Sequence, residues 1–364
     1  MTNEEKILFL SAKINFTLQD EYKIKQLLCH DIDWFEFVES AISCGVLAVS
    51  INNILKINDN SIPKQDLEKI ADDQKIKYVS NNIALWNEFK KVIKIADESD
   101  IPVMPIKGIM LDPVLYASAG LRWTTDIDIL IKKEHLLKME SVLTSLGFKL
   151  AQECANDRDF FINQHYHLAF EKEHVAEKPL KIDVHWDILP VQLKINGLTD
   201  DFWANSGTKE ILGQKLLIPS IEDIFLECAV ELFKDHINHR YFILKRQLDI
   251  SQTIYLFGSK IDWDKFIKRI YKYKLNNWIY YALISNNEIL NNKTISKEIL
   301  IRLKPSFYKK IFIPIIIKIS RIKKLPRLKE LFYIAGLTIL FRNWKGFFIR
   351  FFGWLFKKNR LSNG

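Results

Sequence analysis

The strongest constraint on the fold lies between residues 101 and 186, where short apolar segments alternate with helix-like segments. The first apolar segment, IPVMPI, contains two prolines, which suit the end of a strand and not the interior of a helix. Further along, HYHLAFEK and PLKIDVHW alternate polar and apolar residues with the period of two that is typical of a strand. The order strand, helix, strand, helix, strand, strand, strand predicts a small mixed sheet with helices on one face, an α+β fold.

The sequence on both sides of this region has the spacing of amphipathic helices. Up to Ser99 apolar residues recur every three to four positions, and the pattern returns at Ser220 after a Ser-x-x-Asp capping signal. At 364 residues, the chain exceeds the usual domain size of about 100–200 residues. We therefore expect an N-terminal helical subdomain at 1–98, the core with the sheet at 99–190, a second helical subdomain at 191–304 and a basic aromatic tail at 305–364.

The cysteines and the N-terminus indicate the compartment. The four cysteines are far apart and form no CxxC pair, which argues against a disulfide framework and against a thiolate zinc site. Acidic residues precede the first apolar run, which is the wrong order for a secretory signal. We expect an intracellular, cytoplasmic protein.

The formal net charge of +9 arises from the C-terminal tail. Residues 305–364 contain fourteen Lys and Arg residues and one Glu, so the preceding chain is mildly acidic. The tail segment FRNWKGFFIRFFGWLFKK mixes aromatic and basic residues, and FYIAGLTILF is shorter than the roughly 20 apolar residues that span a bilayer. Three alternatives stay open: peripheral binding to an anionic membrane surface, packing as a final helix, or binding to RNA.

Two pairs of alternating residues carry the chemistry that we expect of the core. On a strand alternate residues share a face, so Asp126 and Asp128 project together, and so do Asp183 and His185 on a later strand. Neighbouring carboxylates repel unless a cation lies between them, and Mg²⁺ prefers carboxylate oxygens. We predict that Asp126, Asp128 and Asp183 are both the metal ligands and the catalytic residues. A site with two Mg²⁺ ions, or Mn²⁺ in their place, would perform phosphoryl transfer.

Other residues near these carboxylates suit the binding of phosphate. Lys107 and Gly108 follow the first strand, where glycine allows backbone amides to approach a triphosphate and the lysine faces it. Arg122 lies four residues before the first aspartate and could clamp a phosphate. His185 could orient Asp183, contact a phosphate or serve only as a structural hydrogen-bond partner.

The segments PIKGIMLDPVLYASAGLRWTTDIDILI and KIDVHWDI resemble the uncharacterised bacterial nucleotidyltransferases of the DNA polymerase beta-like superfamily, often labelled the NTP-transferase-5 group. The resemblance spans residues 82–257 and includes a helical region with a recurrent His and Asp, here His236 and Asp249. The superfamily pattern has Gly-Ser at the position of Lys107-Gly108, so this chain departs from it there.

The resemblance implies a polymerase-beta-like core with helical flanks. It makes Asp126 and Asp128 the metal-binding pair, Asp183 the third carboxylate, and Lys107-Gly108 the nucleotide-binding turn. The implied reaction transfers a nucleotidyl group from a nucleoside triphosphate such as ATP to an acceptor hydroxyl. The acceptor is left open among a small molecule, a peptide, a protein and a tRNA.

Two alternatives belong to other classes of protein. His165 and His167 alternate on one strand and could join Asp183 and His185 in the metal site of a hydrolase. The chain could also be a membrane-associated scaffold that keeps the fold without catalysis, although three clustered acids without a metal would then be an uncompensated electrostatic cost.

Overall fold

The computed structural model describes residues 2–116, 120–173, 179–191, 194–238, 244–290 and 295–303, with the side chains of helix α11 (Ile221–Asn238) described up to Leu232. The chain forms two compact units. One comprises residues 45–227, and the other combines residues 2–44 with the described residues from Cys228 onward. The expected tail at 305–364 lies outside the described residues.

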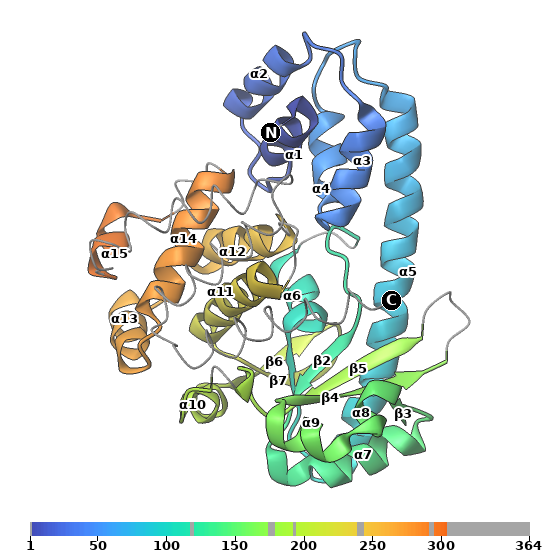
Figure 1. Ribbon diagram of the computed structural model, residues 1–364, viewed down its shortest axis with the longest axis vertical. Helices are drawn as coiled ribbons and strands as arrows, with labels where there is room; N and C mark the ends of the chain where they lie inside the picture. Colours follow the sequence, from blue (N-terminus) through green and yellow to red (C-terminus); the bar gives the residue numbers. More distant parts are fainter. Residues whose placement is uncertain are drawn as a thin grey trace, which may run out of the picture. The chain divides into compact units, whose positions relative to one another are not determined.

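The unit of residues 45–227 is built around a five-stranded mixed sheet with the order β1-β2-β5-β4-β3 (Figure 1). Its strands are β1 (Met104–Ile106), β2 (Ile127–Leu130), β3 (Lys149–Leu150), β4 (His167–Lys172) and β5 (Leu180–His185). The central pair β2 and β5 is parallel, and the other neighbouring strands are antiparallel. The α+β fold predicted from the sequence is confirmed.

Helices α5 (Lys64–Glu98) and α7 (Leu136–Ser145) share one hydrophobic core with this sheet. The core takes apolar residues from the C-terminal half of α5, the inner face of α7, the middle of β4 and alternate positions of β2 and β5. They include Leu85, Phe89, Val92, Met139, Leu143, Ile127, Ile129, Leu168, Phe170, Ile182 and Val184. Because side chains alternate along a strand, the residues between these positions on β2 and β5 face away from the core.

The other elements of this unit are shorter. They are α4 (Leu47–Ile54), α6 (Lys107–Leu115), the 3-10 turn η1 (Lys133–His135), α8 (Gln152–Asn156), α9 (Arg158–Gln164), α10 (Leu198–Ala204), β6 (Gly207–Ile211) and β7 (Gln214–Ile218). Helix α7 stops where expected, because Gly147 takes the left-handed backbone conformation, with φ at +84°, that ends many helices.

Residues 207–218 fall within the helical subdomain expected at 191–304, but they form the hairpin β6–β7. Leu212 and Gly213 both have positive φ, at 50° and 73°, as a two-residue turn requires when it joins twisted strands. β7 packs beside β1, so the hairpin belongs to the unit that contains the sheet.

The second unit is helical. It contains α1 (Asn3–Ser11), α2 (Leu18–Leu27), α3 (Trp34–Ser43), the end of α11, α12 (Leu244–Phe257), α13 (Trp263–Lys272), α14 (Asn276–Leu290) and α15 (Lys297–Arg302). Capping boxes at Thr2 and Thr17 begin α1 and α2. Buried amides tie α12 to α14: Asn286 donates to the carbonyl of Gln247 at 2.7 Å, and Gln247 donates to Ser285 at 3.0 Å.

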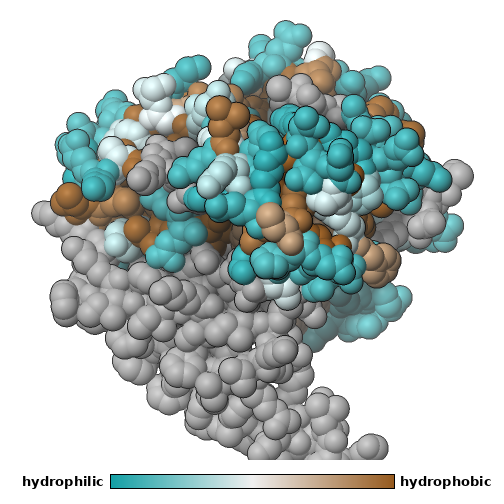
Figure 2. Space-filling view, turned by 90° about the horizontal axis from the view of Figure 1, so that it is seen from above, coloured by the Kyte–Doolittle hydropathy of each residue, from teal (hydrophilic) through white to brown (hydrophobic). Residues whose placement is uncertain are grey.

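None of the described helices combines the length and the apolar composition that crossing a bilayer requires. Figure 2 shows one face of the molecule, on which the coloured hydrophobic residues are interspersed among hydrophilic ones. On that face the described residues therefore form no broad apolar patch.

Candidate active site

The register of the two parallel strands brings the predicted carboxylates together. Asp128 on β2 is paired directly with Asp183 on β5, and His185 follows two residues later on the same face. All three side chains face away from the core, because their neighbours Ile127, Ile129, Ile182 and Val184 fill it. Asp128, Asp183 and His185 are 3%, 7% and 1% exposed. One ligand atom from each lies within 4.8 Å of the others, so among the described residues this group could hold a metal ion.

Asp128 lies against two nitrogen atoms. The Nζ of Lys107 donates to its Oδ1 at 2.6 Å, and the Nε2 of His185 lies 2.8 Å from the same oxygen. The two nitrogens are 3.1 Å apart. Since an ammonium group can only donate, Lys107 is the cation that balances the buried charge of Asp128 in this arrangement.

The environment of Asp183 disfavours its ionised carboxylate. Burial, together with the negative charges of Asp128 and Asp126, raises the pKa of Asp183 to about 7 against the opposing effect of Lys181 and Lys107. Its Oδ1 has no hydrogen-bond partner among the described residues, although the Nζ of Lys181 lies at an ion-pair distance of 3.3 Å. A buried carboxylate beside another carboxylate is an environment that a divalent cation would stabilise.

Asp126 lies in the turn before β2 and is outside the group of three. It is partly buried, and Thr125 Oγ1 donates to its Oδ1 at 3.1 Å. It is near enough to help raise the pKa of Asp183 and of Lys181; burial alone would lower the pKa of Lys181, but Asp183 and Asp126 outweigh that effect. The structure thus groups two of the three predicted carboxylates with His185 and leaves Asp126 beside them.

Lys107 is the first residue of α6, immediately after β1. It is not a glycine, yet its φ is +51°, and its backbone N–H donates to Glu227 Oε2 at 3.2 Å. Gly108 is required by packing: a Cβ there would lie 2.8 Å from the Thr124 Cγ2 and 3.2 Å from an Arg122 nitrogen. The turn predicted to bind nucleotide is therefore closely packed against the loop that leads into β2.

Arg122 lies inside this loop and is 2% exposed. Its guanidinium donates to the carbonyl of Gly108 at 3.3 Å and to Thr124 Oγ1 at 3.2 Å. Asn82 of α5 donates to the carbonyl of Arg122 at 3.0 Å. In the structure Arg122 therefore fixes the first turn of α6, and its predicted contact with phosphate stays a prediction.

The histidines of the hydrolase alternative do not join the group of three. His167 stacks on His185 with ring centroids 4.9 Å apart, and His165 stacks on Phe161 at 4.5 Å. Burial, together with His185 and Lys107, lowers the pKa of His167 to about 2, so this ring is neutral. A site with ligands from His165, His167, Asp183 and His185 is not formed in the described part of the chain.

His236 and Asp249, the recurrent pair of the helical region, follow Asp128 and Asp183 by more than 50 residues in the sequence. Asp249 on α12 is fully buried and lies 4.0 Å from an Arg246 nitrogen. The side chain of His236 lies outside the described residues.

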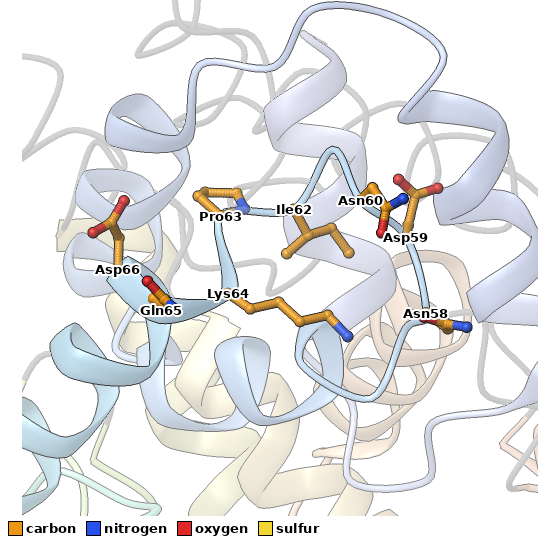
Figure 3. Close-up of a pocket in the computed structure, with 8 residues that line it drawn as sticks. All are labelled: Asn58, Asp59, Asn60, Ile62, Pro63, Lys64, Gln65 and Asp66. Atoms are coloured by element: carbon orange, nitrogen blue, oxygen red, sulfur yellow. The ribbon is translucent and has the colours of Figure 1, made fainter.

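Two hollows in the described part of the chain lie apart from the carboxylates. One, of about 380 Å³, lies at the loop between α4 and α5 (Figure 3) and is lined by Asn58, Asp59, Asn60, Ile62, Pro63, Lys64, Gln65 and Asp66. Another of about 380 Å³ lies between the end of α5 and β7. The first is lined by residues of a single loop and the start of α5, and it contains no predicted site residue. Within this loop Ser61 donates twice to Asp59.

Residues 30–291, more than half of the chain, match the family model described as uncharacterised nucleotidyltransferase. With the mixed sheet and its paired carboxylates, this match defines the class of the protein as a nucleotidyltransferase enzyme. The chain belongs to the uncharacterised nucleotidyltransferase family. The family predicted from the sequence motifs is confirmed.

Solved structures give further similarities at low scores. A solution structure of the antibiotic-resistance factor ANT(2'')-Ia shares 15% identity with a TM-score of 0.33, covering 47% of this chain and 83% of that one. A crystal structure of ANT(2'')-Ia with adenylyl-2''-tobramycin shares 16% with a TM-score of 0.32, covering 48% and 90%. An antigenic nucleotidyltransferase-like protein from Paracoccidioides brasiliensis shares 15% with a TM-score of 0.32, covering 61% and 98%. No curated protein matched the chain.

Proposed function

We propose that this enzyme transfers a nucleotidyl group from a magnesium-bound nucleoside triphosphate to an acceptor hydroxyl. The observation that carries the proposal is the direct pairing of Asp128 with Asp183 on adjacent parallel strands, with His185 beside them. The donor set suits Mg²⁺, because its oxygens are hard ligands and one of them, Asp183 Oδ1, has no hydrogen bond among the described residues. Asp128 and Asp183, with Asp126 next to them, would hold the metal.

The residues around the carboxylates would bind the triphosphate and position the metal ligands. Bound Mg²⁺, as two ions or with Mn²⁺ in its place, would supply charge stabilisation at the phosphates. Lys107 and the N-terminus of α6 bind the triphosphate, and Arg122 keeps Gly108 in place for this contact. His185 orients Asp128 through the 2.8 Å contact.

The chemical step is an in-line displacement. A bond forms between the acceptor oxygen and the α-phosphorus, and the bond from that phosphorus to the bridging oxygen breaks, releasing pyrophosphate. The proton of the acceptor hydroxyl passes to Asp183, the carboxylate that has an oxygen without a hydrogen bond. A small molecule, a peptide, a protein or a tRNA can each supply such a hydroxyl.

The test is calorimetric titration with ATP, GTP, CTP and UTP, each with and without Mg²⁺. We expect magnesium-dependent binding of at least one triphosphate, its loss in Asp128→Asn, and no change in Asp72→Asn, which makes the same substitution at an exposed position of α5. A folded Asp128→Asn variant that still binds and transfers would overturn the assignment of this carboxylate. No binding of any triphosphate by the wild type would overturn the proposed function.

For the tail at 305–364, which lies outside the described residues, we infer from its charge and aromatic content that it attaches the enzyme to an anionic membrane surface. This attachment would make a cytoplasmic enzyme peripheral to the membrane.

A further inference from the structure

Lys107 has contacts at both its side-chain ammonium group and its backbone N–H. Its side-chain Nζ contacts Asp128 and His185 at 2.6 and 3.1 Å, and its backbone N–H is bound by Glu227 at 3.2 Å. The positive φ of Lys107 is strained for a residue with a side chain, and such a conformation persists only where its surroundings hold it. The contacts at the two ends supply that restraint.

The ammonium group of Lys107 competes with a metal ion for Asp128. Its Nζ lies 2.6 Å from Asp128 Oδ1. A Mg²⁺ ion bound to the same oxygen at about 2.1 Å would lie within roughly 5 Å of the ammonium. Two cations at this distance in a buried site repel strongly, so the ammonium must move when the metal binds.

Glu227 competes with a phosphate for the backbone N–H of Lys107. It lies on α11, is buried, and its carboxylate accepts from the first N–H of α6. The first N–H groups of a helix have no partners within the helix and are the groups that hold phosphates. A carboxylate therefore occupies the amide that the proposed function assigns to the triphosphate.

We propose that Lys107 and Glu227 are internal substitutes for the metal ion and the triphosphate, so that these two side chains occupy the binding positions until the metal ion and the triphosphate together displace them. This inference rests on the proposed function and adds a mode of regulation to it. When the triphosphate displaces Glu227, it draws the Lys107 ammonium away from Asp128 and frees that carboxylate for metal. When the metal displaces the ammonium, Lys107 becomes available to the phosphates.

The proposal predicts opposite effects of one substitution on the two ligands. The probes are Mn²⁺ alone, followed by the paramagnetic signal of the free ion, and inorganic tripolyphosphate, followed by calorimetry. If the open arrangement is populated to about a tenth, Lys107→Met should bind Mn²⁺ about tenfold more tightly than the wild type. The same variant should bind tripolyphosphate in the presence of Mn²⁺ more weakly, because the moved ammonium no longer meets the phosphates.

Glu227→Gln is the second variant. The glutamine oxygen can still accept from the Lys107 N–H, so the helix keeps its cap while the competing charge is removed. We expect it to bind tripolyphosphate without metal about tenfold more tightly than the wild type. If Glu227 only caps the helix, this affinity will be unchanged or weaker, and the assignment of Glu227 is then wrong.

The control is Lys133→Met, which removes a lysine that donates to the carbonyl of Ile162 and lies over the Trp186 ring. Lys133→Met should change neither the affinity for Mn²⁺ nor the affinity for tripolyphosphate. Unchanged or weaker Mn²⁺ binding in folded Lys107→Met, with metal-dependent triphosphate binding intact in the wild type, overturns this inference alone. Absence of metal-dependent triphosphate binding in the wild type overturns the proposed function instead.

Discussion

At the scale of single residues, Gly108 has no room for a side chain. A methyl group there would lie 2.8 Å from the Thr124 Cγ2, so Gly108→Ala should destabilise the protein by about 1–3 kcal/mol through overpacking. Urea unfolding measures the loss. Adding Thr124→Ser, which deletes the obstructing methyl group, should recover part of it, and strictly additive losses in the double variant would contradict this account.

The residues of the site differ in how far the sequence could reveal them. Strand alternation predicted that Asp183 and His185 share a face, as they do on β5, but it also grouped Asp126 with Asp128, whereas Asp126 precedes β2 and lies outside the group of three. Glu227 could not be found in this way, since its contact with Lys107 joins positions 120 residues apart and no local pattern marks it. The charge of Arg122 indicated a contact with phosphate, but its almost complete burial depends on the packing of α6 and α5 around it.

At the scale of elements, Glu88 ties α5 to β4. Its carboxylate accepts from Lys172 at 2.9 Å and from Lys91 at 2.6 Å. Burial alone would raise the pKa of Glu88, but the two lysines outweigh it and the pKa is lowered. A lowered carboxyl pKa gives stability that is present above the unfolded-state value, about 4.3, and is lost as the pH falls through the folded-state value.

Glu88→Gln should therefore lower the free energy of unfolding by about 1–2 kcal/mol at pH 7, since hydrogen bonds to charged groups exceed neutral ones. The difference from the wild type should shrink as the pH falls below about 4. Urea unfolding at both pH values checks this, with Glu68→Gln at an exposed position of the same helix as the control. A difference that persists at low pH would mean that packing and not charge is responsible.

The hairpin β6–β7 was missed because its turn, Leu212-Gly213, lacks the Asn-Gly or Asp-Gly signal of such turns. Leu212 has a φ of 50° and is 57% exposed, so its side chain contributes little packing to offset the strain. Leu212→Asn should stabilise the protein by about 0.5–1 kcal/mol, because asparagine tolerates this conformation better. Gly213→Ala should destabilise it by about 1 kcal/mol, from strain alone, since an added Cβ would meet nothing within 4 Å. Thermal unfolding of the two variants should show opposite signs.

At the scale of the whole molecule, the fold class could be predicted but the division into units could not. The expected boundary at residue 98 follows the change from helical to strand pattern. In the structure the buried side of α5, from Leu85 to Ala96, packs in the same core as the strands, so the helix belongs with the sheet. Periodicity locates elements along the chain but does not show which elements share a core. The second unit joins both ends of the described chain, and no local pattern indicates such a pairing.

The tail at 305–364 gives a prediction for the whole chain. The carboxylates of the site lie between residues 126 and 183, and the family match ends at residue 291. A chain that ends at Lys304 keeps α15 together with the backbone carbonyls of Arg302 and Leu303, which accept from Tyr271 and Asn276. We therefore expect the shortened chain to fold and to bind triphosphate with Mg²⁺ as the full chain does.

Removal of the tail should abolish membrane binding, although it should leave triphosphate binding unchanged. The tail carries fourteen basic residues, each worth about 1 kcal/mol near an anionic surface. Flotation with vesicles of mixed anionic and neutral lipid should retain the full chain at low salt, lose it as salt screens the charge, and fail with the shortened chain. Vesicles of neutral lipid alone are the control. If the shortened chain still floats with anionic vesicles, the membrane-binding surface lies in residues 1–304, and the tail has one of the other two tasks that its sequence allows.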